Sequence, residues 1–270
     1  MDLGLKNKVA LITGANNPQG IGAAAAYAFA CEGAKLVIAY KKIIREYDDD
    51  KTNHNGLDRY FKANSDSADE VEEKLRSMGA DCLIIESDIS NEECVKSIFS
   101  RAIERFGKVD ILVNNAADAD SNDNDTIETV TLDVIDKTFA TNVRGTLLMI
   151  REFVKLHSGG YGRIINLSTD AAQVFAGQIT YGASKASVEA LTRSIAIEVG
   201  KYGITVNCVS PGPTQTGWID EKLAESVLPQ IPLGKLIQPQ DIADTIVFLA
   251  SERAVMITGQ VIKVSGGHAL

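Results

Sequence analysis

The sequence has few of the residues from which metal sites and disulfide frameworks are built. Its 270 residues include four cysteines and three histidines. The cysteines are scattered, with no Cys-x-x-Cys pair, and His54, His157 and His268 form no ligand cluster. Structural zinc sites use four such ligands at close spacing, so we expect no metal site. Each cysteine has apolar neighbours, which favours buried, reduced thiols and a cytoplasmic protein.

Long apolar runs and an excess of positive charge are also missing. No hydrophobic stretch approaches the length of a membrane span, and residues 1–6 lack the layout of a signal peptide. The formal net charge of -9 argues against nucleic acid and anionic membrane surfaces as partners. With 45% hydrophobic and 23% charged residues, the chain has the composition of a globular protein with a sizeable core. Its length favours one large domain spanning residues 1–270.

Short apolar runs alternate along the chain with stretches of helical length. Such runs are typical of strands buried on both faces of a parallel sheet. We expect strands at residues 9–13, 35–40, 82–86, 109–113, 163–167, 205–210 and 260–264. Helices are expected at 23–32, 68–78, 132–156, 179–201 and 239–249, and a capping-box pattern from Ser90 to Glu93 predicts another that ends near Phe106. The alternation predicts an α/β fold with a parallel sheet covered by helices on both faces.

A glycine-rich turn separates the first expected strand from the first helix. Gly14, Gly20 and Gly22 follow the pattern Gly-x5-Gly-x-Gly, which differs from the commoner G-x-G-x-x-G fingerprint. A turn between a buried strand and a helix directs backbone N–H groups and the positive helix end at a phosphate. The sequence therefore predicts a dinucleotide site here.

The end of the second strand bears on the choice of cofactor. An acidic residue at this place selects NAD by accepting a hydrogen bond from the ribose 2′-hydroxyl, whereas a basic residue accommodates a 2′-phosphate. The strand ends in Tyr40, Lys41 and Lys42, with no acid before Glu46. We therefore expect NADP(H) rather than NAD(H).

Two segments do not fit the strand–helix alternation. Residues 43–67 are polar and rich in Asp and Asn, which predicts an extended surface loop inserted before the next helix. Residues 212–237 mix apolar and polar side chains after the sixth strand. We expect this second segment to be a lid over the substrate.

Tyr181 and Lys185 are four positions apart in an expected helix, so their side chains project from one face. A neighbouring ammonium favours the phenolate and is expected to lower the pKa of the tyrosine. Tyr181 is then a candidate general acid/base for the interconversion of a hydroxyl and a carbonyl group.

Taken together, these features resemble the short-chain dehydrogenase/reductase family from about residue 5 to residue 267. The residues that match the family's motifs, in order, are Thr13-Gly14, Gly20-Ile21-Gly22, Asp88, Asn114-Asn115-Ala116, Asn142, Ser168-Thr169, Tyr181-x-x-x-Lys185, and Pro211-Gly212 with Thr216. The resemblance implies a Rossmann-like, doubly wound sheet of seven parallel strands in one domain, with a bound nicotinamide cofactor.

The resemblance also implies a role for each position. Tyr181 exchanges a proton with the substrate oxygen, Lys185 holds the nicotinamide ribose, and Asn142 anchors a water that links Lys185 to solvent. Asn114 and Ala116 flank the ribose and base of the cofactor. The residues placed at the cofactor are Gly14, Asn16, Gln19, Gly20, Ile21, Gly22, Tyr40, Lys41, Asp88, Ile89, Asn115, Ala116, Ala117, Lys185, Pro211, Gly212, Thr214 and Thr216.

The chain departs from the family pattern in its glycine turn, which is two residues longer, in Ala117, where glycine is usual, and in the 43–67 insertion. It departs also at the catalytic hydroxyl. Counting thirteen residues back from Tyr181 gives Ser168, whereas aligning the strand gives Thr169. A slip of one residue would turn every side chain of a buried strand to the other face, so we favour Thr169.

The function expected from these features is NADP(H)-dependent interconversion of a carbonyl and a secondary alcohol, with a 3-oxoacyl-thioester reductase as the nearest-looking subgroup. An NAD(H)-dependent sugar or polyol dehydrogenase and a non-catalytic dinucleotide-sensing protein are the alternatives. The helices at 132–156 and 179–201 carry more apolar residues than one sheet face can cover, and relatives usually pair through them. We therefore expect a homotetramer or a dimer.

Overall fold

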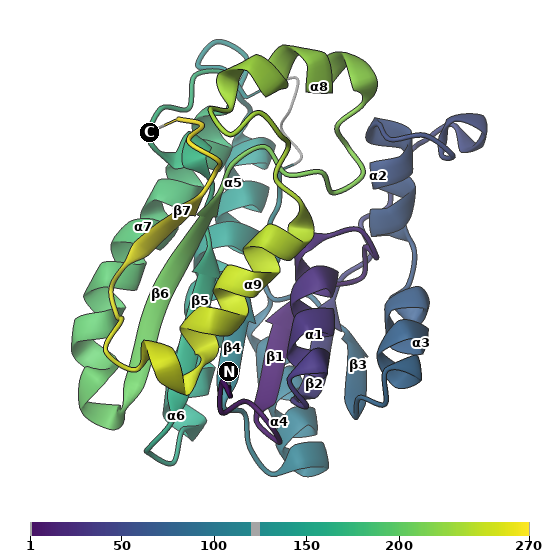
Figure 1. Ribbon diagram of the computed structural model, residues 1–270. Coiled ribbons are helices and arrows are strands. Elements are labelled where there is room, and N and C mark those ends of the chain that lie inside the picture. The colour runs from purple at the N-terminus through teal and green to yellow at the C-terminus, as the bar shows by residue number, and fades with distance from the viewer. Residues whose placement is uncertain (1, 120–124, 270) are drawn as a thin grey trace.

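One sheet of seven parallel strands organises the protein. The computed structural model describes residues 2–119 and 125–269. The strands lie in the order β3-β2-β1-β4-β5-β6-β7 (Figure 1). Their bounds are β1 Val9–Thr13, β2 Lys35–Tyr40, β3 Cys82–Glu86, β4 Ile111–Asn114, β5 Gly162–Leu167, β6 Ile204–Pro211 and β7 Val261–Val264. All of the expected strands are confirmed, and the order reverses direction between β1 and β4, where sheets of this kind bind their ligands.

Helices cover both faces of the sheet and form two cores. Along β1, Ala10 and Ile12 belong to one core, while Val9 and Leu11 belong to the other, as the alternation of side chains along a strand requires. The helices that pack on the first face are α1 Ile21–Cys31, α3 Asp69–Ser77 and α9 Pro239–Ala250. The helices on the second face are α4 Glu92–Phe106, α6 Thr146–Leu156 and α7 Ile179–Val199. The predicted fold, a single Rossmann-like domain, is confirmed.

The insertion at residues 43–67 is not the extended loop that its polarity predicts. It contains a short 3-10 helix at Asp49–Lys51 and the helix α2 Leu57–Ser65 (Figure 1). No residue of α2 is fully buried, so core packing does not hold the helix in place, although Leu57, Tyr60 and Phe61 share one of its faces. The side-chain amide of Asn16 instead donates hydrogen bonds to the carbonyls of Asn64 and Asp66, both at 3.1 Å. A residue of the glycine turn thus satisfies the carboxyl end of α2.

The expected helix at residues 132–156 is interrupted. It consists of α5 Leu132–Phe139, a π-helical segment at Ala140–Gly145 and then α6. Asn142 lies inside the π segment, where its side chain is buried. Asn is a poor residue for a helix interior, and π segments are frequently found at functional sites.

Two smaller expectations are also wrong. The N-cap of α4 is Asn91, whose side chain accepts hydrogen bonds from the N–H groups of Glu93 and Cys94, and Ser90 instead donates its hydroxyl to Asp88. All four cysteines are free, but Cys31 is exposed, because it ends α1 on the side away from the core.

Within the described residues no group of side chains could hold a metal ion. No helix in residues 2–119 and 125–269 has the length and apolar character of a membrane span.

Candidate active site

The glycine turn between β1 and α1 forms a cradle that only glycine permits. Gly14 has φ +67°, and a Cβ atom there would lie 2.6 Å from the Cα atom of Ala116. A Cβ atom on Gly22 would lie 2.7 Å from the carbonyl oxygen of Gly14. Gly20 is the N-cap of α1 and supplies no side-chain cap, and no acidic residue lies in the first turn. The helix end therefore presents free N–H groups to an anion, and the turn fits the diphosphate of a dinucleotide.

Asn115 and Ala116 attach the end of β4 to this turn. The Thr13 hydroxyl accepts hydrogen bonds from the N–H groups of Asn115 and Ala116, at 3.1 and 3.0 Å. The side-chain amide of Asn115 donates to the carbonyls of Thr13 and Gly14, at 2.9 and 2.7 Å. These bonds fix the distance between β1 and β4 where the strand order reverses.

The side chain of Asn114 is engaged in the interior of the protein. Its amide donates to the side-chain oxygen of Asn166 at 2.9 Å, and Asn166 donates in turn to the Thr192 hydroxyl on α7. The chain of three polar groups lies within the buried interior and joins β4 and β5 to α7. Neighbouring residues of a strand point to opposite faces, so the side chains of Asn114 and Asn115 have different partners.

Lys41 and Asp88 meet at the ends of β2 and β3. The Nζ atom of Lys41 lies 2.7 Å from an Asp88 carboxylate oxygen, and the other carboxylate oxygen accepts from Ser90. Burial alone would raise the pKa of Asp88, but the hydrogen bonds from Lys41 and Ser90 hold it below its ordinary value. Tyr40 and Ile89 are buried next to this pair. The structure thus brings together the predicted adenosine-side residues.

The glycine turn also holds the insertion and the expected lid. The amide of Asn17 donates to the Thr216 carbonyl at 3.2 Å, and a Cβ atom on Gly217 would lie 2.8 Å from the side-chain oxygen of Gln19. The Gly56 N–H, at the start of α2, donates to the Gly217 carbonyl at 2.8 Å. Residues 212–237 contain the helix α8 Glu221–Val227, which Figure 1 shows at the same end of the molecule as α2.

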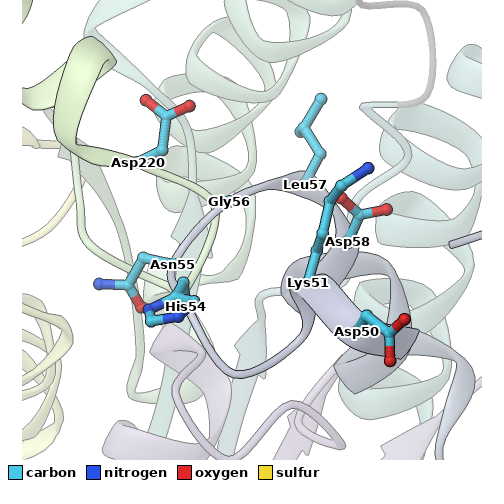
Figure 2. A pocket seen from close by; sticks show the side chains of 8 residues that line it. All are labelled: Asp50, Lys51, His54, Asn55, Gly56, Leu57, Asp58 and Asp220. Carbon is cyan, nitrogen blue, oxygen red and sulfur yellow. The ribbon is translucent and has the colours of Figure 1, made fainter. Parts of the chain in front are cut away.

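A polar pocket lies where the insertion meets the lid. Lys51, His54 and Asp58 line it from the insertion, and Asp220 lines it from the lid segment (Figure 2). The two segments, residues 43–67 and 212–237, are far apart in the sequence and therefore form one surface only in the folded chain. The short 3-10 helix of the insertion gives this pocket one of its walls.

Tyr181 and Lys185 lie on the same face of α7, as their spacing predicts. The Nζ atom of Lys185 is 5.8 Å from the centre of the Tyr181 ring and donates to the Leu167 carbonyl at 2.8 Å. Lys185 is buried, and this burial lowers its pKa to about 8. Both side chains thus stand at the carboxyl end of β5.

The expected shift of the tyrosine has the opposite sign in the structure. Burial raises the pKa of Tyr181 above its ordinary value, and the nearby Tyr60 and Asp170 raise it further. Desolvation disfavours the phenolate, while the Lys185 ammonium is directed at a backbone carbonyl. Tyr181 is therefore a protonated phenol at neutral pH.

The two candidate hydroxyls after β5 have different surroundings. The Ser168 hydroxyl is buried and donates to the Glu189 carboxylate on α7 at 2.8 Å. Thr169 is half-buried, and its hydroxyl lies 3.5 Å from a carboxylate oxygen of Asp170. The Ser168 hydroxyl is thus engaged by the middle of α7, and the choice of Thr169 stays a prediction.

Asn142 connects the π segment to the loop after β4 and to α7. Its side-chain oxygen accepts from the N–H of Asp118 at 2.7 Å. Its amide donates to the Asp118 carbonyl and to the Ser184 hydroxyl, both at 2.9 Å. Ser184 precedes Lys185, so Asn142 holds the turn of α7 that carries the lysine.

The sequence gives no sign of three further residues at this site. Asp125 accepts hydrogen bonds from the N–H groups of Thr180 and Tyr181 at the start of α7. Asp170 pairs with His268 near the C-terminus, at 2.6 Å. Each contact joins positions that are more than 50 residues apart, so no local pattern could reveal it. Residues 120–124, within the acidic loop that precedes Asp125, lie outside the described residues.

The glycine cradle, the strand order and the Tyr/Lys pair define a dinucleotide-binding oxidoreductase fold. A family model described as enoyl-(acyl carrier protein) reductase matches residues 50–269. The chain is 35% identical to a (2S)-[(R)-hydroxy(phenyl)methyl]succinyl-CoA dehydrogenase subunit of Thauera aromatica, with 99% of each chain covered. It is 35% identical to a 3-oxoacyl-[acyl-carrier-protein] reductase of Staphylococcus aureus, covering 96% of this chain and 97% of that protein.

Solved structures agree with these relatives. A short-chain dehydrogenase/reductase from Serratia marcescens superposes with a TM-score of 0.82 at 28% identity, covering 98% of this chain and 99% of that one. A 3-ketoacyl-(acyl-carrier-protein) reductase from Brucella melitensis, complexed with NADH, has a TM-score of 0.79 at 32% identity and covers 98% and 100%. A blue fluorescent protein from a metagenomic library, in complex with NADPH, has a TM-score of 0.80 at 30% identity and covers 98% and 99%.

The chain belongs to the short-chain dehydrogenase/reductase family, and the protein is an oxidoreductase. The resemblance stated from the sequence is therefore confirmed. The two solved complexes contain different nicotinamide dinucleotides, so they support a cofactor of this kind without separating NADP(H) from NAD(H).

Proposed function

We propose that the protein reduces a carbonyl group to a secondary alcohol, with NADP(H) as cofactor and Tyr181 as the general acid. The observation that carries the proposal is the position of Tyr181 and Lys185 at the carboxyl end of β5, the strand that Thr169 follows in the chain. The glycine cradle opens at this same edge of the sheet. The nicotinamide, when bound, supplies the hydride.

The residues of the chain have separate tasks in this reaction. Tyr181 gives its phenolic proton to the substrate oxygen as negative charge develops there. Tyr181 is protonated at neutral pH, so the phenol holds the proton that reduction of a carbonyl requires. Thr169 donates a hydrogen bond to the same oxygen. Lys185 would hold the ribose of a bound nicotinamide, and its ammonium would place a positive charge near the phenolate that remains.

The preference for NADP(H) rests on the end of β2. Tyr40, Lys41 and Lys42 leave no carboxylate there to accept from a ribose 2′-hydroxyl. The side chain of Lys41 is 61% exposed, so its ammonium can turn from Asp88 to a 2′-phosphate. The Asp88 carboxylate would then be available to accept a hydrogen bond from the edge of the adenine base.

The substrate class that fits best is a 3-oxoacyl thioester. Two relatives at 35% identity carry names that refer to thioester-linked substrates, a succinyl-CoA derivative and a 3-oxoacyl carrier protein. The insertion and the lid, which share hydrogen bonds, would form the wall that selects among such substrates. The four free cysteines fit a reducing, cytoplasmic location.

The proposed assembly is a homotetramer or dimer. Leu132 and Ile197 are 73% and 85% exposed on α5 and α7, and Leu147 is exposed on α6. A second copy would bury these side chains, because apolar groups on neighbouring helices favour a shared interface. Light scattering at micromolar concentration tests this, and a monomer would contradict it.

Loss of NADPH absorbance with a panel of carbonyl compounds, including 3-oxoacyl thioesters, tests the activity. Tyr181→Phe should remove turnover while NADPH still quenches protein fluorescence with unchanged affinity. Wild-type turnover in Tyr181→Phe would contradict the mechanism. Tyr202→Phe, which makes the same change at an exposed tyrosine, is the matched control and should keep its activity.

A further inference from the structure

The C-terminal segment of the chain returns to the loop that carries Thr169. The Nδ1 atom of His268 lies 2.6 Å from Oδ2 of Asp170, the residue after Thr169. The side-chain amide of Gln173 donates to the Ala269 carbonyl at 2.7 Å, which holds the same two segments together. The side chains of Asp170 and His268 are 8% and 22% exposed, so the pair is largely buried. The reaction proposed above leaves this pair without a role.

The two oxygens of the Asp170 carboxylate point to different partners. Oδ2 faces His268, while Oδ1 lies 3.5 Å from the Thr169 hydroxyl. Close packing keeps the carboxylate in this place, since a Cβ atom on Gly212 would lie 3.2 Å from Oδ2 and 2.8 Å from Ser265. An ionised carboxylate only accepts hydrogen bonds, so Asp170 competes with a substrate for the proton of the Thr169 hydroxyl. A bond from His268 weakens this competition.

The charge of Asp170 also reaches the phenol. It is one of the groups that raise the pKa of Tyr181, after burial and Tyr60 on α2. A carboxylate near a developing phenolate opposes proton transfer, and a hydrogen bond from the His268 ring to that carboxylate weakens the opposition. On the far side of the pair, Lys263 of β7 directs its ammonium at the Ala269 carbonyl, at 3.5 Å.

The same C-terminal segment contacts the lid. The N–H of Leu233 donates to the Gly266 carbonyl at 3.1 Å, and a Cβ atom on Gly267 would lie 2.8 Å from Pro232. His268 follows these glycines directly. The segment thus joins the lid to the loop of Thr169 through the His268–Asp170 pair and the bond from Gln173 to Ala269.

We propose that His268, acting through Asp170, is a positioning residue that frees the Thr169 hydroxyl for the substrate and eases proton transfer from Tyr181. The proposal rests on the proposed carbonyl reduction. His268 touches neither substrate nor cofactor in this role. Its effect is expected on kcat, with the affinity for NADPH unchanged.

Two variants separate the hydrogen bond from the size of the side chain, because asparagine and leucine are similar in shape. His268→Asn keeps an N–H donor near the position of Nδ1, whereas His268→Leu has no donor. We expect kcat to fall about tenfold in His268→Leu, the size of one lost charge-assisted hydrogen bond, and to be largely restored in His268→Asn. The pH above which kcat falls should also change in His268→Leu, because the Asp170 carboxylate then lacks its hydrogen bond from His268.

The double variant His268→Leu/Asp170→Asn gives the sharpest outcome. Removing the carboxylate removes the charge that His268 offsets, so the double variant should turn over faster than His268→Leu alone. A purely structural contact predicts the reverse, since a second change would add to the damage. Asp133→Asn, which alters an exposed carboxylate paired with Lys137 on α5, is the control and should behave as wild type.

A readout without turnover keeps the two proposals apart. The Nδ1–H proton of His268 should give a low-field NMR resonance that disappears in Asp170→Leu and in His268→Asn. Wild-type kcat and pH profile in His268→Leu, beside an inactive Tyr181→Phe, would overturn the positioning role alone, as would absence of the resonance. Wild-type turnover in Tyr181→Phe would instead overturn the proposed function. If His268→Leu does not fold, His268→Asn with its pH profile, together with the resonance, decides the matter.

Discussion

The carboxylate of Asp125 accepts a hydrogen bond from the backbone N–H of Tyr181 at 3.1 Å, across 56 positions of the chain. Its other oxygen accepts from the N–H of Thr180 at 2.8 Å. The helix α7 has no side-chain cap of its own, because Gln178 makes no capping bond. A carboxylate at a helix N-terminus also interacts favourably with the helix dipole. The loop after β4 therefore sets where the helix of the candidate catalytic tyrosine begins.

Removing this cap should affect both stability and turnover. Asp125→Ala is expected to lower the free energy of unfolding by about 1–2 kcal/mol, as for other N-caps, and to lower kcat by shifting Tyr181. Urea denaturation and steady-state kinetics measure the two effects. Asp125→Asn keeps one acceptor and should lie between wild type and Asp125→Ala. An Asp125→Ala protein as stable as wild type would show that the start of α7 is held by other contacts.

The buried Lys185 side chain should lower the free energy of unfolding at neutral pH. Its pKa is lowered from 10.5 to about 8 in the folded state, so folding disfavours the charged form. The penalty is fully present below pH 8 and is relieved as the pH rises from about 8 towards 10.5. Lys185→Met should therefore be inactive yet more stable at pH 7, by about 2 kcal/mol after the lost bond to Leu167 is deducted.

Thermal and urea unfolding at pH 7 and pH 10 check this prediction. The advantage of Lys185→Met should shrink at pH 10, where the wild-type lysine is neutral in the folded state. Lys201→Met, in the exposed 3-10 helix Gly200–Tyr202 that follows α7, is a control that should show neither effect. An advantage that is equal at both pH values would mean that packing, and not charge, accounts for it.

The two hydroxyls after β5 should respond differently to removal. Thr169→Ala is expected to lower kcat about a hundredfold, the usual cost of one donor to a developing oxyanion, whereas Thr169→Ser keeps the donor. Ser168→Ala should leave kcat nearly unchanged and lower stability by about 1 kcal/mol through the lost bond to Glu189. Steady-state kinetics and urea unfolding distinguish the two. The reverse pattern would assign the catalytic hydroxyl to Ser168.

The choice of cofactor should depend on Lys41. Lys41→Asp exchanges an attraction for a repulsion at the 2′-phosphate, and the new carboxylate can accept from a 2′-hydroxyl. The ratio of kcat/KM for NADPH to that for NADH should fall about a hundredfold. Lys42→Asp changes the neighbouring lysine, which lies 3.7 Å from Glu86, and should shift the ratio far less. A wild-type ratio in Lys41→Asp would place the preference elsewhere.

The strands were predictable because a buried parallel strand leaves a plain signal. Val9–Thr13, for example, is apolar apart from its last residue and is buried throughout. The turn and the Tyr/Lys pair were predictable for a related reason, since close approach of the backbone demands glycine and helical spacing places two side chains together. These features depend on residues that are near in sequence.

The remaining features depend on distant contacts. The helix α2 escaped prediction because its end is satisfied by Asn16, which lies about 50 positions earlier. The predicted direction of the Tyr181 pKa shift was wrong. Spacing shows that Lys185 is near, but burial, which the spacing does not show, has the larger effect on the pKa. The pairing of Asp170 with His268 spans 98 positions, and neither residue stands in a recognisable motif.

The hydrogen bonds that join the glycine turn, the insertion and the lid have a consequence for protein engineering. Asn16 holds the end of α2, Asn17 holds Thr216, and Gly56 holds Gly217. Replacing any one of these segments with the loop of a homologue would leave polar groups of the other two without their hydrogen-bond partners. A designer who wishes to retarget this enzyme has to exchange all three segments together, as a single cassette.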